Sequence, residues 1–136
     1  MTDRGGTPHG ADIGLEDAAR LLMEMPDGSP IADLLVHCLL ALRSPRERIP
    51  LDVLRTMTWL APMLPGYTTS PVHARSLAHL RGVRADVLRT RDGWQTVAWR
   101  PDRLGQVGTV RVNAASEALA LCAGTIAACA SGARAG

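Results

Sequence analysis

The chain has 136 residues and a net charge of +2, and 46% of its residues are hydrophobic and 21% charged. This length favours one domain with its own core, and the composition is typical of globular proteins. The N-terminus is polar and glycine-rich, and the longest weakly apolar run, residues 118–130, is too short to cross a bilayer. We therefore expect a cytoplasmic domain without a membrane partner.

Helical spacing of apolar residues predicts three helices in the first half of the chain. A disordered tail is expected over residues 1–13, followed by a first helix over 15–25. A second helix over 31–43 is apolar almost all round and is therefore expected to be central. The third begins at Pro50 and ends at Pro65-Gly66. Its expected buried side consists of Leu51, Leu54, Met57, Thr58 and Leu60.

A fourth helix is predicted over residues 70–82. Ser70 suits an N-cap, Pro71 suits the first turn, and Gly82 suits the position after the last turn. Its expected buried face consists of Ala74, Leu77 and Leu80, and the opposite face of Val72, Arg75, Ser76 and His79.

The period then changes from 3.6 to 2, which predicts a hairpin over residues 84–100 with Asp92-Gly93 as its turn. This turn pairs Arg89 with Thr96. The larger apolar side chains of the hairpin are expected to face inward and its arginines outward. The inner set is Leu88, Val97 and Trp99, and the outer set is Arg89, Arg91 and Arg100.

A short strand over residues 109–112 and a final helix beginning at Asn113 or Ser116 complete the domain, followed by a frayed tail over 132–136. The final helix is rich in alanine and glycine, which allow close helix approach. We therefore expect a homodimer through it, formed by Leu119, Cys122, Ile126 and Cys129. In the alternative, the helix covers the core of its own domain, or its two cysteines act as a redox or metal pair.

The charge of the chain is unevenly distributed. Residues 1–70 hold six Arg and nine Asp or Glu, a net charge of −3, whereas residues 71–111 hold eight Arg and three Asp, a net charge of +5. This asymmetry favours an anionic partner for the middle of the chain. A solvated basic face remains the alternative.

Residues 73–101, HARSLAHLRGVRADVLRTRDGWQTVAWRP, resemble the recognition helix and wing of bacterial ArsR and MarR regulators. The resemblance implies a mainly α fold with a small β-hairpin: a winged helix-turn-helix over residues 14–131 with flanking N- and C-terminal helices. In that fold the fourth helix packs on the two helices before it and enters a DNA groove. Two features differ from the family: the link over residues 62–70 is longer, and the fourth helix has no cysteine pair.

The resemblance also implies a dimeric transcriptional regulator that binds double-stranded DNA. The alternative is a winged-helix interaction module that binds protein without DNA. The fourth helix and the hairpin supply the expected contacts through polar, basic and aromatic side chains. The expected DNA-binding residues are Thr69, Ser70, Val72, Arg75, Ser76, His79, Arg89, Arg91, Trp94 and Arg100.

Motifs for catalysis and for metal or cofactor binding are not found. The chain has no CxxC, HExxH or GxSxG sequence and no phosphate-binding glycine loop. His37-Cys38 lies within the apolar second helix and is expected to be a packed core pair. We therefore expect no enzyme, no cofactor and no metal; a small-molecule effector is left open.

Overall fold

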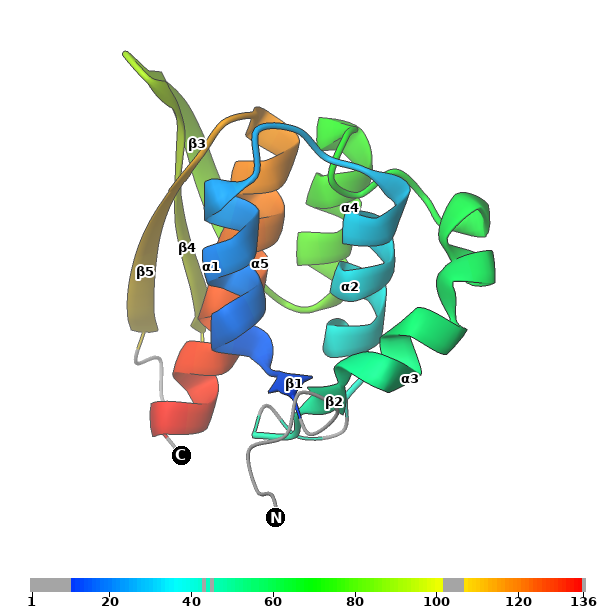
Figure 1. The fold of residues 1–136 in the computed structure, drawn as a ribbon. Helices are drawn as coiled ribbons and strands as arrows, with labels where there is room; N and C mark the ends of the chain where they lie inside the picture. The colour runs from blue at the N-terminus through cyan, green and yellow to red at the C-terminus, as the bar shows by residue number, and fades with distance from the viewer. Residues whose placement is uncertain (1–10, 43, 45, 102–106, 136) are drawn as a thin grey trace.

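The structure is a computed structural model, and it describes residues 11–42, 44, 46–101 and 107–135. Five strands, five α-helices and one 3₁₀ helix are assigned within these residues (Figure 1). In chain order they are β1 (Asp12–Ile13), α1 (Leu15–Glu24), α2 (Pro30–Leu40), β2 (Ile49–Pro50), α3 (Leu51–Thr56), the 3₁₀ helix η2 (Thr58–Met63), α4 (Pro71–Leu80), β3 (Arg84–Thr90), β4 (Gly93–Pro101), β5 (Val107–Ala114) and α5 (Glu117–Ala135).

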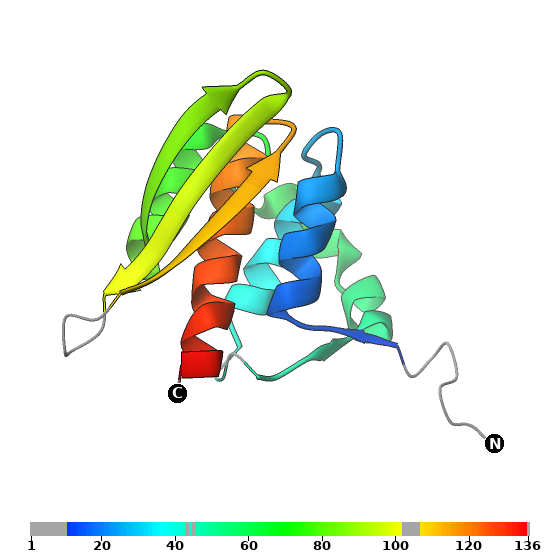
Figure 2. The ribbon, with the colours of Figure 1, turned by 90° about the vertical axis from the view of Figure 1, so that its left-hand side faces the viewer.

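The architecture is mixed α/β. Strands β3, β4 and β5 form an antiparallel sheet in that order, and β1 pairs with β2 in a second, minimal sheet. One face of the larger sheet packs on α5, with α1 and α4 on either side of that helix (Figures 1 and 2). The expected helices and hairpin are present. The third strand is longer than predicted, since β5 covers Val107–Ala114 rather than residues 109–112, and it makes the sheet a full layer of the domain.

Helix α5 is the centre of the core. The side chains of Leu119, Cys122 and Ile126 are inaccessible to solvent, and Cys129 is 3% exposed. These are the residues predicted to form a dimer interface, so that prediction is wrong and the alternative, that the helix covers its own core, is correct. The helix begins as the Ser116 alternative predicts, because the Ser116 hydroxyl accepts a hydrogen bond from the Leu119 amide at 3.2 Å. It continues to Ala135, so the predicted frayed tail is helical to that residue.

The buried residues of the N-terminal helices have the predicted spacing, but the ends of the helices differ from the predicted ends. The apolar residues that recur at helical spacing in α1 are buried on one face of the helix, namely Leu15, Ala18, Ala19 and Leu22. Helix α2 ends at Leu40 and has the expected central place. Strand β1 pairs Ile13 with Ile49, so the predicted disordered tail ends before Asp12. Residues 1–10 of that tail lie outside the described residues.

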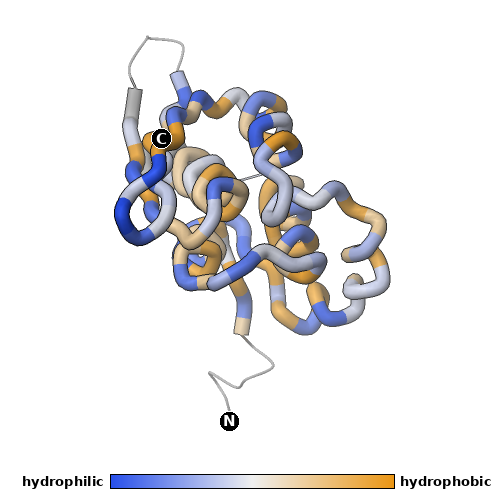
Figure 3. Tube along the Cα trace, turned by 90° about the horizontal axis from the view of Figure 1, so that it is seen from above, coloured by the Kyte–Doolittle hydropathy of each residue, from blue (hydrophilic) through white to orange (hydrophobic). Residues whose placement is uncertain are grey.

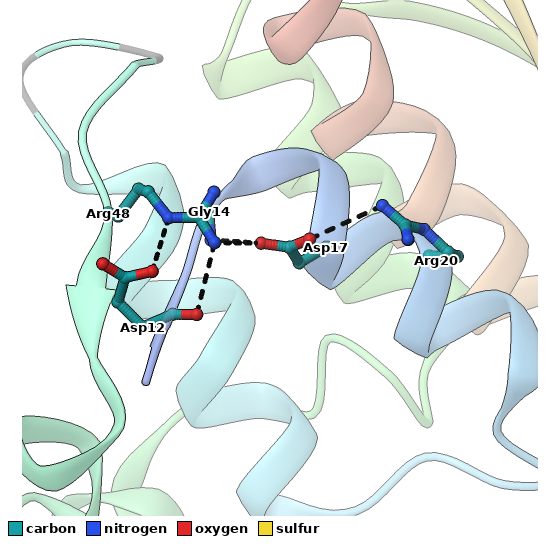
Figure 4. A network of polar contacts seen from close by, with 5 residues as sticks. All are labelled: Asp12, Gly14, Asp17, Arg20 and Arg48. Atoms are coloured by element: carbon teal, nitrogen blue, oxygen red, sulfur yellow. Dashed lines mark hydrogen bonds and ion pairs between the residues drawn. The ribbon is translucent and has the colours of Figure 1, made fainter. Parts of the chain in front are cut away.

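An ion-pair network joins β1, α1 and the segment before β2 (Figure 4). Arg48 donates from Nε to Asp12 Oδ1 and from Nη2 to Asp17 Oδ2, both at 2.6 Å. Asp17 also accepts a hydrogen bond from the Gly14 amide at 3.1 Å. This bond, followed by the Arg48 guanidinium, holds the pKa of Asp17 below its ordinary value of 3.8.

The predicted third helix is divided into α3 and η2. Met57 ends α3, and η2 contains Pro62, which has no amide to donate within a helix. No side chain of α3 is fully buried, so the predicted buried side is wrong; Leu51 and Leu54 are only partly covered. The pair α3–η2 therefore lies at the periphery, on the far side of α2 from the sheet (Figure 1). None of the described helices is long and apolar enough to span a bilayer.

Candidate nucleic-acid interface

Helix α4 begins where the sequence predicts, but it packs against other elements than the predicted ones. The Ser70 hydroxyl caps it by accepting from the His73 amide, and Ala74 and Leu77 are buried as expected. Leu80, expected on the same buried face, is 78% exposed. The helix packs chiefly on α5 and touches the edge of the sheet at β3. The expected support by the two helices before α4 is therefore wrong, because the long buried α5 occupies that place.

A buried polar cluster holds the loop that leads into α4. The amide and hydroxyl of Thr68 donate to Asp33 Oδ1 at 2.8 and 2.6 Å, and the Ser29 amide donates to Thr68 Oγ1 at 3.0 Å. Gly28 lies so close that a Cβ there would be 2.0 Å from the Thr68 carbonyl oxygen. Because Thr68 is two residues before the N-cap, this cluster sets where α4 begins.

The predicted contact residues on the exposed side of α4 differ in whether they already have a partner within the chain. Val72 is 72% exposed, and Ser76 and His79 are also exposed. Arg75 lies 3.5 Å from the Glu117 carboxylate of α5, so its charge is already partnered within the chain. Among the predicted loop residues, the Thr69 hydroxyl donates to the Gly66 carbonyl at 3.4 Å and the Ser70 hydroxyl is the cap.

The hairpin has a different register from the predicted one. Thr90 pairs with Gly93 and Arg89 with Trp94, so the turn is Arg91-Asp92 rather than Asp92-Gly93, and Arg89 does not face Thr96. The cause is the third strand. A Cβ at Gly93 would be 2.5 Å from the Ala114 carbonyl of β5, so glycine is needed in β4 for this close approach.

The two faces of the hairpin are also reversed. Thr96 and Ala98 are inaccessible to solvent and face α5, whereas Leu88, predicted to be buried, is 51% exposed. The reversal has a packing cause: α5 approaches β4 closely at Gly124, where only small side chains fit beneath the helix. The inner face of the sheet is therefore built mainly from small or flat residues, namely Ala85, Val87, Trp94, Thr96, Ala98, Val110, Val112 and Ala114.

The predicted basic residues of the hairpin do not form one cluster. Arg89 lies over the Trp94 ring, with its guanidinium carbon 5.8 Å from the ring centroid, and Arg91 is exposed in the turn, the hydrophilic loop at the left edge of Figure 3. We call Arg89 and Arg91 the tip arginines. Arg100 lies at the opposite end of β4.

Two arginines absent from the predicted set lie at the same end as Arg100. Arg81 follows the last residue of α4, and Arg84 begins β3 and pairs with Trp99, the neighbour of Arg100. We call Arg81, Arg84 and Arg100 the base arginines. The charge count over residues 71–111 includes Arg81 and Arg84, but only the tertiary structure places them at the same end of the sheet as Arg100. By strand alternation Arg84 belongs to the opposite face of the sheet from Arg100.

The arginines of the two halves of the chain differ in their partners. In the first half, Arg20, Arg48 and Arg55 each pair with an aspartate. Among the carboxylates that the structure describes, none pairs with a tip or base arginine. All five side chains belong to exposed residues. The positive charge of the α4–β4 segment is therefore available to a partner.

The surface also has a cleft beside the hairpin turn and a groove among the N-terminal helices. A cleft of about 650 Å³ separates the hairpin turn from the α1–α2 connection and includes Met23, Glu24, Arg91 and Trp94. A groove of about 330 Å³ between α1, α2 and α3 is lined mainly by apolar side chains. Its exposed rim includes Leu21 and Ile31, which are 42% and 55% exposed.

The three cysteines are free thiols; Cys122 and Cys129 are buried, and Cys38 is partly buried. Cys122 donates from Sγ to the Tyr67 carbonyl at 3.1 Å, and burial raises the pKa of its thiol far above the ordinary value. Burial also raises the pKa of Cys38. Both shifts disfavour the thiolate that metal binding and redox exchange require.

The chain matches no protein-family model, and no similar curated protein or solved structure is found.

Proposed function

We propose that the chain is a small regulator that binds double-stranded DNA through the β3–β4 hairpin and the adjoining α4. One observation carries the proposal: five exposed arginines without ion-pair partners among the described carboxylates lie on this segment, whereas Arg20, Arg48 and Arg55 of the first half each pair with an aspartate. Unpaired arginines gain energy from phosphates by releasing counterions from the duplex.

The spacing of these arginines suits a duplex. Strand β3 has seven residues and spans about 20 Å, so the tip and base arginines are separated by about that distance. The major groove is about 12 Å wide, so the two groups can reach phosphates on both of its sides. Ser76 and His79 on the exposed side of α4 are the candidates for contacts to base edges.

The element order α3, η2, α4, β3, β4 supports a winged-helix mode of binding, with α4 as the recognition helix and the hairpin as the wing. In this proposal α5 supports α4 in place of the preceding helices. Arg75 and Ser70 have structural partners and contribute less than the tip arginines.

The test is binding to mixed genomic DNA across a range of salt concentrations. Wild-type affinity is expected to fall steeply as salt rises. The Arg89→Ala/Arg91→Ala variant is expected to reduce the slope of log K against log salt by about 2, one unit for each lost phosphate contact. The control is Arg20→Ala/Arg55→Ala, which removes the same charge from arginines that already have partners. Equal losses in the two variants would contradict a defined interface.

The second candidate function is a protein-interaction module, favoured by the apolar groove between α1, α2 and α3. Ile31, and Trp59 and Met63 of the neighbouring η2, are 55%, 65% and 72% exposed, which is unusual for large apolar side chains. This function requires that wild type show no salt-dependent DNA binding. It also requires that a photo-crosslinker at Leu21 capture one defined partner, and that Ile31→Asp abolish this capture.

A further inference from the structure

The outer face of the β3–β4–β5 sheet is amphipathic, and none of the other described elements covers it. Figure 2 looks onto this face, and no described helix or strand lies in front of it. Three cross-strand rows make up the face: Arg84–Trp99–Thr109, Asp86–Val97–Arg111 and Leu88–Gln95–Asn113.

Apolar side chains follow the middle of this face. Val97 and Trp99 are partly exposed on the central strand, and Leu88 is 51% exposed beside them. These are the three residues whose character predicts burial, and the described part of the chain leaves Val97 and Trp99 partly exposed and Leu88 exposed. The side chains on a sheet face exposed to solvent are normally polar. An apolar centre therefore indicates a surface that another molecule covers.

The charges on this face have a specific arrangement. Asp86 and Arg111 lie in the same row, on the two outer strands, with Val97 between them. Two strand spacings, about 10 Å, separate their backbones, and no ion pair joins them in the described structure. Neither charge has an ion-pair partner among the described residues, and the two have opposite signs at equal distances from the centre of the row.

We propose that the occupant of this face is the same face of a second copy of the chain, related by a two-fold axis parallel to β4. Such an axis exchanges the two outer strands while keeping each row at its own height. Asp86 then faces Arg111 of the second copy, and Arg111 faces its Asp86. Val97 and Trp99 meet their own counterparts at the centre, which is the self-complementarity that an isologous interface requires.

An axis perpendicular to the strands through this row is disfavoured. It would place Asp86 against Asp86 and Arg111 against Arg111, and like charges at an interface cost several kcal/mol. The arrangement with the axis parallel to β4 is an aligned sheet-on-sheet packing, in which the strands of the two sheets lie within about 30° of each other.

The dimer is expected to be weak. The face covers roughly 25 by 15 Å, which is small compared with the roughly 800 Å² per partner of a standard interface. The proposal replaces the α5 interface predicted from the sequence, whose residues are buried in the core. It shares Arg84 with the proposed DNA-binding surface, but it uses neither the tip arginines nor α4.

The test is sedimentation equilibrium of the full chain without DNA, at concentrations up to about 1 mM. Wild type is expected to dimerise, and Asp86→Arg and Arg111→Asp each to weaken dimerisation at least tenfold, because each single change sets like charges against each other. An equimolar mixture of the two variants is expected to form a heterodimer, since both cross-pairs then have opposite charges. The double variant Asp86→Arg/Arg111→Asp is expected to dimerise like wild type.

The outcomes are distinct. A monomeric wild type across this range, or single variants that dimerise unchanged, would overturn the proposal. So would a mixture of single variants that stays monomeric although each variant is folded by circular dichroism. The double variant keeps the net charge of the chain, so its DNA binding separates the two proposals: loss of dimer rescue with intact DNA binding rejects only the interface.

Discussion

Gly124 of α5 lies directly against Thr96 of β4. A Cβ at Gly124 would be 2.7 Å from Thr96 Cγ2 and 3.3 Å from Thr96 Cβ, so the helix and the strand approach as closely as a glycine allows. This contact selects the small side chains of the inner face and turns the larger ones, Leu88 and Trp99, outward.

Gly124→Ala is therefore expected to destabilise the chain by about 1–3 kcal/mol, although alanine favours a helix over glycine by about 1 kcal/mol. Urea unfolding measures the change. Thr96→Ser removes the Cγ2 atom, so the double variant Gly124→Ala/Thr96→Ser is expected to recover part of the loss. Additive effects of the two substitutions in this double-mutant cycle would show that the contact is not the cause.

Thr96→Val is expected to stabilise the chain by about 1 kcal/mol. The Thr96 hydroxyl is buried without a hydrogen-bond partner among the described residues, and a methyl group of the same shape removes that cost. The matched control is Thr125→Val, because the buried Thr125 hydroxyl donates to the Leu121 carbonyl at 2.8 Å and gives up this bond. If both substitutions shift the unfolding midpoint equally, the unpaired hydroxyl is not the source of the effect.

Asp33→Ala is expected to destabilise the chain by about 2–4 kcal/mol, because it leaves the Thr68 amide and hydroxyl without their acceptor in a buried place. Asp33→Asn keeps an oxygen acceptor and is expected to cost less. The change should also reach α4, so hydrogen exchange of the α4 amides is the second readout. A loss of stability without faster exchange there would separate the cluster from the start of the helix.

The ion-pair network of Asp17 makes the free energy of unfolding depend on pH in the acid range. Because the pKa of Asp17 is lowered in the folded state, its contribution is present above the ordinary value of 3.8 and is lost as pH falls through the folded value. Asp17→Asn is expected to flatten this acid decline in the free energy of unfolding. Asp52→Asn is the control, since Asp52 belongs only to an exposed pair with Arg55. The same acid slope in the Asp17 variant and wild type would exclude the network as its source.

Glu117→Gln is expected to raise DNA affinity by a few-fold at low salt, because it releases the Arg75 guanidinium from its 3.5 Å ion pair. In the wild-type background, Arg75→Ala is expected to weaken DNA binding less than Arg91→Ala. Fluorescence anisotropy with a labelled duplex measures both effects. The opposite order would mean that Arg75 leaves Glu117 when DNA binds.

Local features of the structure followed from the sequence alone. The spacing of apolar residues in α1, the Ser70 cap with Pro71, and the Ser116 start of α5 each depend on residues within one or two turns. The alternation that sorts the hairpin into two sets of side chains was also correct, because a register shift of two residues leaves the sets unchanged.

Which set faces the core was decided only by the tertiary structure. Apolar character favoured Leu88, Val97 and Trp99, but the approach of α5 at Gly124 leaves room only for Thr96 and Ala98. The tertiary structure also decided the position of the turn, because the close approach of the Ala114 carbonyl of β5 requires Gly93 to lie within β4. It decided the role of α5 as well, because the small residues of that helix pack against the sheet of their own chain. Caps and periodicity act over a few residues, whereas the inner face of a sheet depends on the shape of a helix that begins about twenty residues later in the chain.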